Sequence, residues 1–386
     1  MCSVLVLIIF FLYSVGYNIF GVLAADIIEG CKISLSSAGL LQSFFQIGAL
    51  LGIGLSPLAL MKLSSLNRLR IGIFFDAVGM ILLAIIPSSL SISILFVFMG
   101  LGGFYIDSGA NAYLAETFPN KRQSLIPLLH FSYSLGALLC GYLVLPFKSP
   151  TSWGWGYGIV GVTLAFLFVL GYIANSKNPK EVINIEVEKE VQPVPTKKIL
   201  SDKNFIMYCI VIMMYMASQQ TCSSWLPLFI EKDFNASASL VAATTMSFWI
   251  GIAVMRLISP ILLKTGKINA MESIQYGMLI SFFAMLGISL STNIAFALIC
   301  SAICGFGAGA VIPLFIVEVS SWYPGNTGFI STFYIVVGTI GRFIFPYLVA
   351  FFGDRYGMRI ALGASSLLLF VGTVLAFVVT YRKKHE

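Results

Sequence analysis

The residues of this chain that are best suited to chemistry are charged and polar side chains inside long apolar runs. Asp107 lies within one such run, Asn111 follows it by four positions, and His130 lies in the next run. A carboxyl group near an imidazole in apolar surroundings can take up and release a proton. This pattern predicts that Asp107 and His130 couple a process to protons. The alternatives are that Asp107 caps a glycine-rich kink and that His130 is a packing residue.

A second group of residues is suited to contact a polar solute. Gln42 and Gln46 are four positions apart, as are Tyr215 and Gln219, so each pair shares one helix face. Amide and phenol groups suit a neutral polyol, and a tryptophan can stack on the apolar face of a sugar, although amides also hold transmembrane helices together. The predicted substrate-binding residues are Tyr17, Asn18, Gln42, Gln46, Asn111, Tyr215, Gln219, Trp249 and Arg342.

Arg342 stands apart because a charge deep in an apolar run costs roughly 2.5–3.5 kcal/mol even on lenient scales. It either binds an anionic substrate or pairs with an acid such as Asp107, and the sequence slightly favours pairing. Four more charges lie nearer the ends of their runs, where hydration of the side chain is the simpler explanation. Their alternative role is gating, through ion pairs that bias a two-state equilibrium. These predicted gating residues are Asp76, Glu116, Arg256 and Glu318.

The elements that must position these residues are membrane-spanning helices. The chain is 58% hydrophobic and only 10% charged, whereas about a quarter of a soluble domain is charged. Apolar runs of roughly 20 residues, long enough to cross about 30 Å of hydrocarbon, recur along the chain. The sequence predicts an all-α polytopic membrane protein with twelve helices, near 4–25, 36–60, 70–87, 92–116, 123–147, 155–174, 204–230, 237–263, 270–290, 294–319, 327–352 and 359–381.

The predicted helices form two similar sets of six. Pro119 and Pro324 end the related stretches NAYLAETFP and IVEVSSWYP and are 205 positions apart (324 − 119). The same offset, or one two residues shorter, pairs Gly48 with Gly251, Gly100 with Gly305, Gly102 with Gly307 and Gly136 with Gly341. One six-helix unit has therefore been used twice, as in many secondary transporters.

A polar segment rich in Lys, Glu and Pro divides the chain. We interpret 175–203 as a cytoplasmic linker between an N-terminal bundle, 1–174, and a C-terminal bundle with a short basic tail, 204–386. If both termini are cytoplasmic, most Lys and Arg residues fall in cytoplasmic segments, as the positive-inside rule requires. The net charge of +7 therefore indicates topology and not binding to nucleic acid. We expect the membrane to be the plasma (inner) membrane.

The sequence lacks the patterns of an enzyme or a metalloprotein. It has no Ser/His/Asp set and no phosphate-binding loop, and no His or carboxylate completes a metal site around Cys300 and Cys304. The seven cysteines are interpreted as small packing residues. We expect no catalysis and no cofactor.

Three stretches resemble the fucose–proton symporter (sugar permease) family within the major facilitator superfamily. They are AGLLQSFFQIGALLGIGLSPLALMKLS (38–64), DSGANAYLAETFPNKRQSLIPLLHFSYSLGA (107–137), and a region from YMASQQTCSSWL (215–226) through GFGAGAVIPLFIVEV (305–319). The resemblance implies two six-helix bundles that rock about a central cavity, and import of a sugar with protons.

The resemblance also suggests roles for single residues. The family's functional positions fall on Asn18, Asp107, Asn111 and His130. The sequence departs from the family at Gly21 and Gln219, which replace acids, and at Asp26, which carries a displaced outward-facing acid. Fewer carboxylates are therefore available for coupling.

These patterns predict a monomeric transporter, embedded in membrane lipids, that moves a small hydrophilic solute by alternating access. The solute is expected to be a sugar or sugar derivative, with protons as the coupling ion. An exporter of amphiphilic drugs or metabolites is the alternative, because 32 Phe and 14 Met residues suit varied apolar ligands. A membrane receptor that kept the fold without transport is less favoured.

Overall fold

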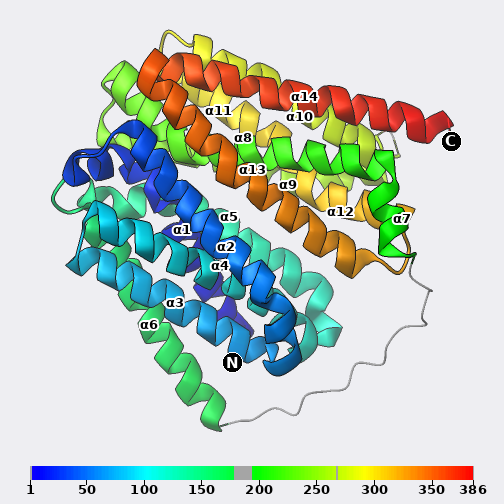
Figure 1. Ribbon diagram of the computed structural model, residues 1–386, viewed down its shortest axis with the longest axis horizontal. Helices are drawn as coiled ribbons and strands as arrows, with labels where there is room; N and C mark the ends of the chain where they lie inside the picture. The colour runs from blue at the N-terminus through cyan, green and yellow to red at the C-terminus, as the bar shows by residue number, and fades with distance from the viewer. Residues whose placement is uncertain (1, 178–193, 267, 386) are drawn as a thin grey trace. The chain divides into compact units, whose positions relative to one another are not determined.

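The computed structural model describes residues 2–177, 194–266 and 268–385, in which every regular element is a helix (Figure 1). The long helices are α1 Ser3–Cys31, α2 Leu35–Lys62, α3 Ser65–Ile85, α4 Ser89–Thr117, α5 Arg122–Val144, α6 Trp153–Lys177, α8 Lys203–Phe234, α9 Ala238–Lys264, α10 Ala270–Leu290, α11 Ile294–Ala308, α12 Val311–Trp322, α13 Thr327–Tyr356 and α14 Met358–His385. A short helix, α7 Thr196–Ser201, precedes α8, and two 3₁₀ turns, η1 Pro119–Lys121 and η2 Leu145–Phe147, flank α5.

Eleven segments of the described chain are helical, long and apolar enough to cross a membrane. The one predicted helix that is missing from these eleven is the third, near 70–87, which corresponds to α3. Helix α3 is excluded because three charged residues, Arg68, Arg70 and Asp76, lie within its 21 residues. The all-α prediction is confirmed. The predicted linker is only partly described, since α6 reaches Lys177, α7 lies near its other end, and 178–193 are outside the described residues.

The span predicted at 294–319 is present as Ile294–Trp322, but its helix is interrupted, which the sequence had not predicted. Helix α11 ends at Ala308 and α12 starts at Val311. Pro313 explains the break, because proline has no amide hydrogen to donate to the carbonyl four residues earlier and its ring crowds that carbonyl. The carbonyl in question belongs to Gly309. It accepts a hydrogen bond from Arg256 Nε of α9 instead, at 3.4 Å.

Contacts divide the chain into two compact units. Unit 1 comprises Met1–Glu186 and Ser237–Met246, and unit 2 comprises Val187–Ala236 and Ser247–Glu386. Helices α1 to α6 therefore belong to unit 1, and α7, α8 and α10 to α14 belong to unit 2. In Figure 1 their colours run from blue to green and from green to red, respectively.

In unit 1, helices α2 and α4 cross with their backbones in contact. A Cβ atom on Gly48 would lie 1.9 Å from the carbonyl oxygen of Val97, and one on Gly100 would lie 1.9 Å from that of Phe45. Only glycine permits such an approach, which is a common way for transmembrane helices to pack.

Unit 2 contains the equivalent crossing, between α9 and α11. A Cβ on Gly251 would lie 2.0 Å from the carbonyl oxygen of Ala302, and one on Gly305 would lie 2.0 Å from that of Phe248. These four residues are the repeat partners of the four in unit 1. The sequence repeat is therefore also a repeat of helix crossings.

A second crossing is repeated in the same way. A Cβ on Gly102 of α4 would lie 2.8 Å from the Gly72 carbonyl of α3, and one on Gly307 of α11 would lie 2.4 Å from the Gly277 carbonyl of α10. Gly72 and Gly277 are also separated by the repeat offset of 205 (277 − 72). They are a further repeat pair, in addition to those found in the sequence.

The start of α8 is fastened to the α12–α13 connection within unit 2. Asp202 caps α8 by accepting a hydrogen bond from the amide of Asn204 at 2.7 Å, and it accepts another from the Tyr323 hydroxyl. Asn326 exchanges hydrogen bonds with the backbone of Val194, at 2.8 and 3.0 Å. Asp202, Tyr323, Asn326 and Val194 lie outside the candidate membrane spans, and Asn204 is the second residue of one.

We expect Asp202 to make the stability of unit 2 depend on pH. Burial opposes its ionisation, but hydrogen bonds from Tyr323 and from the amides of Asn204 and Phe205, with the charge of Lys383, outweigh it and lower the pKa of Asp202. A lowered folded-state pKa stabilises the fold above the unfolded value of about 3.9, and the stabilisation disappears as pH falls through the lower, folded value.

The measurement is thermal unfolding in detergent of wild type and Asp202→Asn. The wild type should be the more stable at about pH 6, and the difference should shrink below about pH 3. Tyr323→Phe should lower stability at pH 6 in the same direction, because it removes one donor to the carboxylate. A difference between wild type and Asp202→Asn that is constant from pH 6 to pH 3 would contradict this account.

Candidate functional site

The predicted coupling residue Asp107 lies on α4, ten residues before the helix ends at Thr117, or about 15 Å at 1.5 Å per residue. It is half-buried and accepts a hydrogen bond on Oδ1 from Asn111 Nδ2 at 3.0 Å. The same Nδ2 also donates to the Asp107 main-chain oxygen at 2.9 Å. The carboxylate and the amide predicted to share a helix face therefore form one hydrogen-bonded pair.

His130 lies on α5 of the same unit, and its side chain is exposed. The edge of its ring meets the ring of Phe10 on α1, with centroids 6.0 Å apart and planes at 81°. Its partnership with Asp107 stays a prediction.

Tyr17 and Gln46 are brought together across α1 and α2. Gln46 Nε2 donates to the Tyr17 hydroxyl at 3.3 Å, and Gln42 lines a pocket with Tyr17 and Phe45. About 220 Å³ of empty space, part of it open to the surroundings, lies among these residues.

Asn18 is buried on α1. Its Nδ2 donates to the Ser14 carbonyl of the same helix at 2.8 Å, while its Oδ1 has no hydrogen-bond partner among the described residues. A buried unpaired amide oxygen is costly, which is the kind of atom that a solute hydroxyl or a water can satisfy.

Two of the predicted gating residues in unit 1 have different surroundings. Glu116 is exposed and accepts a hydrogen bond from Ser65 Oγ at 2.5 Å, which ties the end of α4 to the start of α3. Asp76 is only 1% exposed, and its Oδ2 has no partner in the described part of the chain. Hydration at a helix end, the simpler explanation of its charge, therefore does not fit Asp76.

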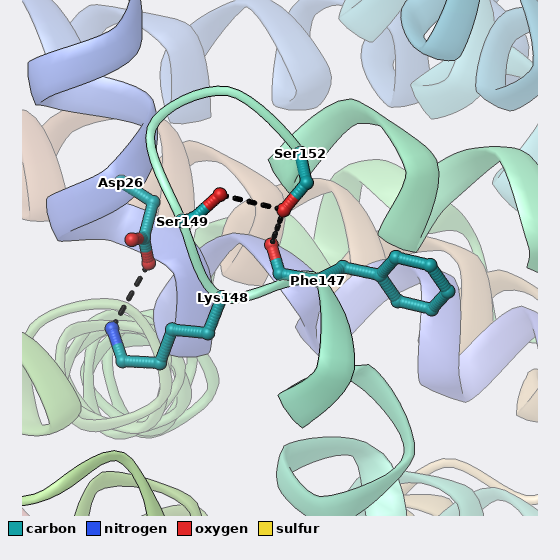
Figure 2. Close-up of polar contacts among 5 residues, drawn as sticks. All are labelled: Asp26, Phe147, Lys148, Ser149 and Ser152. Atoms are coloured by element: carbon teal, nitrogen blue, oxygen red, sulfur yellow. Dashed lines mark hydrogen bonds and ion pairs between the residues drawn. The ribbon is translucent and has the colours of Figure 1, made fainter.

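Asp26, the displaced acid of α1, forms a buried ion pair. Lys148 Nζ lies 2.9 Å from Asp26 Oδ2 (Figure 2), and the Lys148 and Asp26 side chains are 5% and 9% exposed, respectively. Lys148 lies in the turn between η2 and α6. That turn is held by the Ser152 hydroxyl, which donates to the Phe147 carbonyl at 3.0 Å and lies 2.7 Å from the Ser149 hydroxyl.

In unit 2, Tyr215 and Gln219 line one pocket, as their four-residue spacing predicts. Tyr215 is 1% exposed, and its hydroxyl has no hydrogen-bond partner among the described residues. The pocket has about 190 Å³ of empty space. It is also lined by Ser218, whose buried hydroxyl lacks a partner within the described chain.

One of the two predicted arginines, Arg256, lies next to this pocket. Arg342 on α13 and Arg256 on α9 are half-buried, and the charges of both act electrostatically on the Tyr215 hydroxyl. Arg256 is anchored at Gly309, next to Ala308, which lines the pocket. The structure thus places Arg256, a predicted gating residue, next to a pocket that is lined by the predicted substrate-binding residues Tyr215 and Gln219.

The other predicted residues of unit 2 make contacts with sequence neighbours. Trp249 is 3% exposed, and its ring meets the Phe248 ring at 79°. Glu318 accepts a hydrogen bond from Trp322 Nε1, one turn along α12, at 3.0 Å. A structural role accounts for each of these contacts, and their predicted roles in binding and gating stay predictions.

Sequence reasoning missed an aromatic stripe on α1. The rings of Phe10 and Tyr13 are 5.8 Å apart and those of Tyr13 and Tyr17 are 6.3 Å apart. Their spacing of three and four residues is the signal that could have revealed the stripe, since it puts all three on one helix face. The sequence analysis also missed Ser218, because nothing in the surrounding sequence marks this serine as a pocket residue.

Similarity to known proteins agrees with this architecture. The sequence model of the Major Facilitator Superfamily matches residues 6–346. A protein TsgA homologue from Buchnera aphidicola is 21% identical over 372 residues, which cover 94% of this chain and 91% of that protein. The inner membrane transport protein YdiN of Escherichia coli is 21% identical over 294 residues, which cover 74% and 68%, respectively.

Among solved structures, the fold is similar to that of a bacterial homologue of the human lysosomal transporter Spinster in an inward-facing and occupied conformation. The TM-score is 0.82 at 13% identity, over 98% of this chain and 96% of that one. At 13% identity this structural similarity shows the fold alone. The family assignment rests on the sequence model, which matches residues 6–346. The chain belongs to the Major Facilitator Superfamily and is a multi-pass membrane transporter, not an enzyme, as its sequence predicted.

Proposed function

We propose that the protein is a secondary active transporter that moves a small hydrophilic solute, a sugar or sugar derivative, by alternating access and with protons bound at Asp107. The observation that carries this proposal is the hydrogen bond from Asn111 Nδ2 to Asp107 Oδ1, about 15 Å from the nearer end of α4. An acid at that depth is costly and usually functional. The distribution of Lys and Arg supports cytoplasmic termini.

The pair offers a direct link between proton and solute. While Asp107 is ionised, its carboxylate holds the Asn111 amide through a charge-assisted hydrogen bond. Protonation removes the charge, weakens that bond and frees the amide to donate to a solute hydroxyl. The proton therefore binds before the solute, and the solute leaves before the proton. His130, on α5 of the same unit, is the proposed proton partner.

An exporter of amphiphiles is the second candidate. The 32 Phe and 14 Met residues of the chain favour it, because such side chains accept varied apolar ligands. An exporter should be stabilised by apolar cations and a sugar symporter by hydroxylated solutes. The two candidates can thus be separated by a binding screen.

The first experiment is a thermal-shift screen of the purified protein against neutral sugars, sugar acids and apolar cations. A ligand at a hundred times its Kd adds about 2.7 kcal/mol to the stability of the folded state. The solute that stabilises most is then used for uptake into proteoliposomes. Stabilisation by apolar cations alone would favour the exporter.

We expect Asp107→Asn to lower accumulation driven by a pH gradient by at least tenfold, while exchange of labelled solute across the membrane continues. The amide resembles the protonated acid, so it permits movement of the solute but cannot release a proton. Asp354→Asn is the matched control, since Asp354 is an exposed acid near the end of α13 and should transport normally. Full accumulation by Asp107→Asn would contradict proton coupling through this residue.

A further inference from the structure

Three sulfur atoms from three different helices meet in the core of unit 2. Cys222 Sγ of α8 lies 3.7 Å from Met285 Sδ of α10 and 4.0 Å from Cys304 Sγ of α11. All three side chains are at most 2% exposed, and both cysteines are free thiols. We call these three residues the sulfur cluster. Met285 and Cys304 are 63 and 82 positions from Cys222 in sequence, so the spacing of the cysteines alone does not reveal the cluster.

The helices that carry Met285 and Cys304 are held together beside the sulfur atoms. Ser281 Oγ of α10, one turn before Met285, donates a hydrogen bond to the main-chain carbonyl of Cys304 at 2.9 Å. Three residues after Cys304, the crossing at Gly277 and Gly307 brings the backbones of α10 and α11 into contact. Ligands on helices that are supported in this way keep their positions better than ligands on loops. The cluster is therefore a preorganised arrangement of sulfur atoms.

The distances between the sulfur atoms suit one metal ion between them. Three sulfur ligands at about 2.3 Å from an ion and at angles of about 120° lie about 4.0 Å from each other. The two separations in the cluster, 3.7 and 4.0 Å, are close to this value. Little movement of α8, α10 and α11 is therefore needed for an ion to be bound by all three sulfur atoms.

The types of ligand favour a soft monovalent cation. Thiolate and thioether sulfur together are ligands for Cu(I), whereas Zn²⁺ is usually bound by four ligands drawn from thiolates, imidazoles and carboxylates. Within the described chain, no group of three His, Cys, Asp or Glu side chains could hold a metal ion. The third ligand of the cluster is a thioether, so Cu(I) is the ion that fits, and Ag(I) is its redox-inert analogue.

The cluster borders the pocket of unit 2. Cys222 and Cys304 line it, and about 190 Å³ of empty space, part of it open to the surroundings, adjoins them, which gives an ion a way to enter. Each thiol that binds gives up its proton, so Cu(I) with two thiolates and a thioether has one negative charge. The hydroxyls of Tyr215 and Ser218 line the same pocket and lack hydrogen-bond partners among the described residues. Such hydroxyls can donate to a thiolate and offset its charge.

We propose that Cys222, Met285 and Cys304 form a binding site for Cu(I). The ion connects α8, α10 and α11 at one point, so its binding stabilises unit 2. The inference goes beyond the proposed transport function and does not depend on which solute is carried. It also differs from the interpretation of the cysteines as packing residues alone.

The test uses the purified full-length protein with Cys2→Ser and Cys31→Ser, because these two thiols are exposed and half-buried and would bind copper themselves. Ascorbate keeps the copper as Cu(I), and transfer from its coloured bicinchoninate complex measures binding. We expect one Cu(I) per protein, with three sulfur neighbours at about 2.3 Å in the X-ray absorption spectrum. Ag(I) should raise the melting temperature, and Zn²⁺ at the same concentration should not. No transfer of copper, or an equal effect of Zn²⁺, would overturn the proposal.

Variants identify the ligands. Cys222→Ala and Cys304→Ala should each weaken Cu(I) binding at least a hundredfold, and Met285→Leu at least tenfold. Leucine is close to methionine in volume, so Met285→Leu tests the site even where an alanine variant does not fold. Cys209→Ala and Met278→Leu are the matched controls, because both residues are buried on α8 and α10, respectively, and both variants should bind normally.

Two results of this series would contradict the site. Unchanged Cu(I) affinity in Cys222→Ala and Cys304→Ala would show that the sulfur atoms only pack against each other. Unchanged affinity in Met285→Leu would show that the thioether is not a ligand and would refute a site made of three sulfur atoms.

Discussion

Replacing Lys148 with methionine should lower the free energy of unfolding by about 3–5 kcal/mol, because the variant leaves a buried carboxylate without its partner. The pair is close, with Lys148 Nζ 2.9 Å from Asp26 Oδ2, and both side chains are at most 9% exposed. The measurement is unfolding in mixed micelles followed by tryptophan fluorescence.

The double variant Asp26→Asn with Lys148→Met should regain most of the lost stability, since exchanging a buried ion pair for neutral groups is often close to neutral. Lys232→Met is the matched control, because Lys232 is exposed at the end of α8, and it should change stability by less than about 0.5 kcal/mol. If Lys148→Met unfolds like the wild type, the ion pair does not stabilise the junction of α1 with the α5–α6 turn.

Gly48→Ala and Gly251→Ala should each destabilise their unit by about 3 kcal/mol or more. The added Cβ would lie 1.9 Å from the Val97 carbonyl in the first variant and 2.0 Å from the Ala302 carbonyl in the second. Both obstacles are backbone atoms, so the helices themselves must separate, at the upper end of the cost of overpacking. The measurement is the unfolding free energy in micelles, with the yield of monodisperse protein as a second readout.

Gly54→Ala, on the same helix as Gly48, separates the crossing from helix propensity. A Cβ at Gly54 meets nothing within 4 Å, and alanine is the better helix former by up to about 1 kcal/mol, so this variant should be neutral or slightly stabilising. Equal effects of Gly48→Ala and Gly54→Ala would show that the crossing between α2 and α4 tolerates a side chain.

The sequence was sufficient for the helices and for their repetition, because long apolar runs and glycine spacing depend on local composition. It was not sufficient for the break at Gly309–Ala310. Pro313 was visible, but prolines also lie inside α5, α8, α9 and α13 without ending them. At this break the released Gly309 carbonyl accepts a hydrogen bond from Arg256 of α9, a contact between residues 53 positions apart that the local sequence does not reveal.

In the candidate site, the pairing of residues along one helix was predictable from the sequence, whereas the burial of single side chains was not. Four-residue spacing correctly paired Asp107 with Asn111 and Tyr215 with Gln219, because such pairs are set by the helix itself. Burial was harder to predict, since Asp76 and Glu116 both lie in apolar helices but Asp76 is 1% exposed and Glu116 is exposed. That difference depends on which side of the helix faces its neighbours, and no single run of sequence contains that information.

The backbone crossings bear on how such a protein can evolve. Where two helices touch through carbonyl oxygens and glycine Cα atoms, the fit depends very little on the side chains around the contact. Mutations can then accumulate on the remaining faces of α2, α4, α9 and α11 without changing how these helices cross. Crossings of this kind would let the fold persist while the solute-facing positions change.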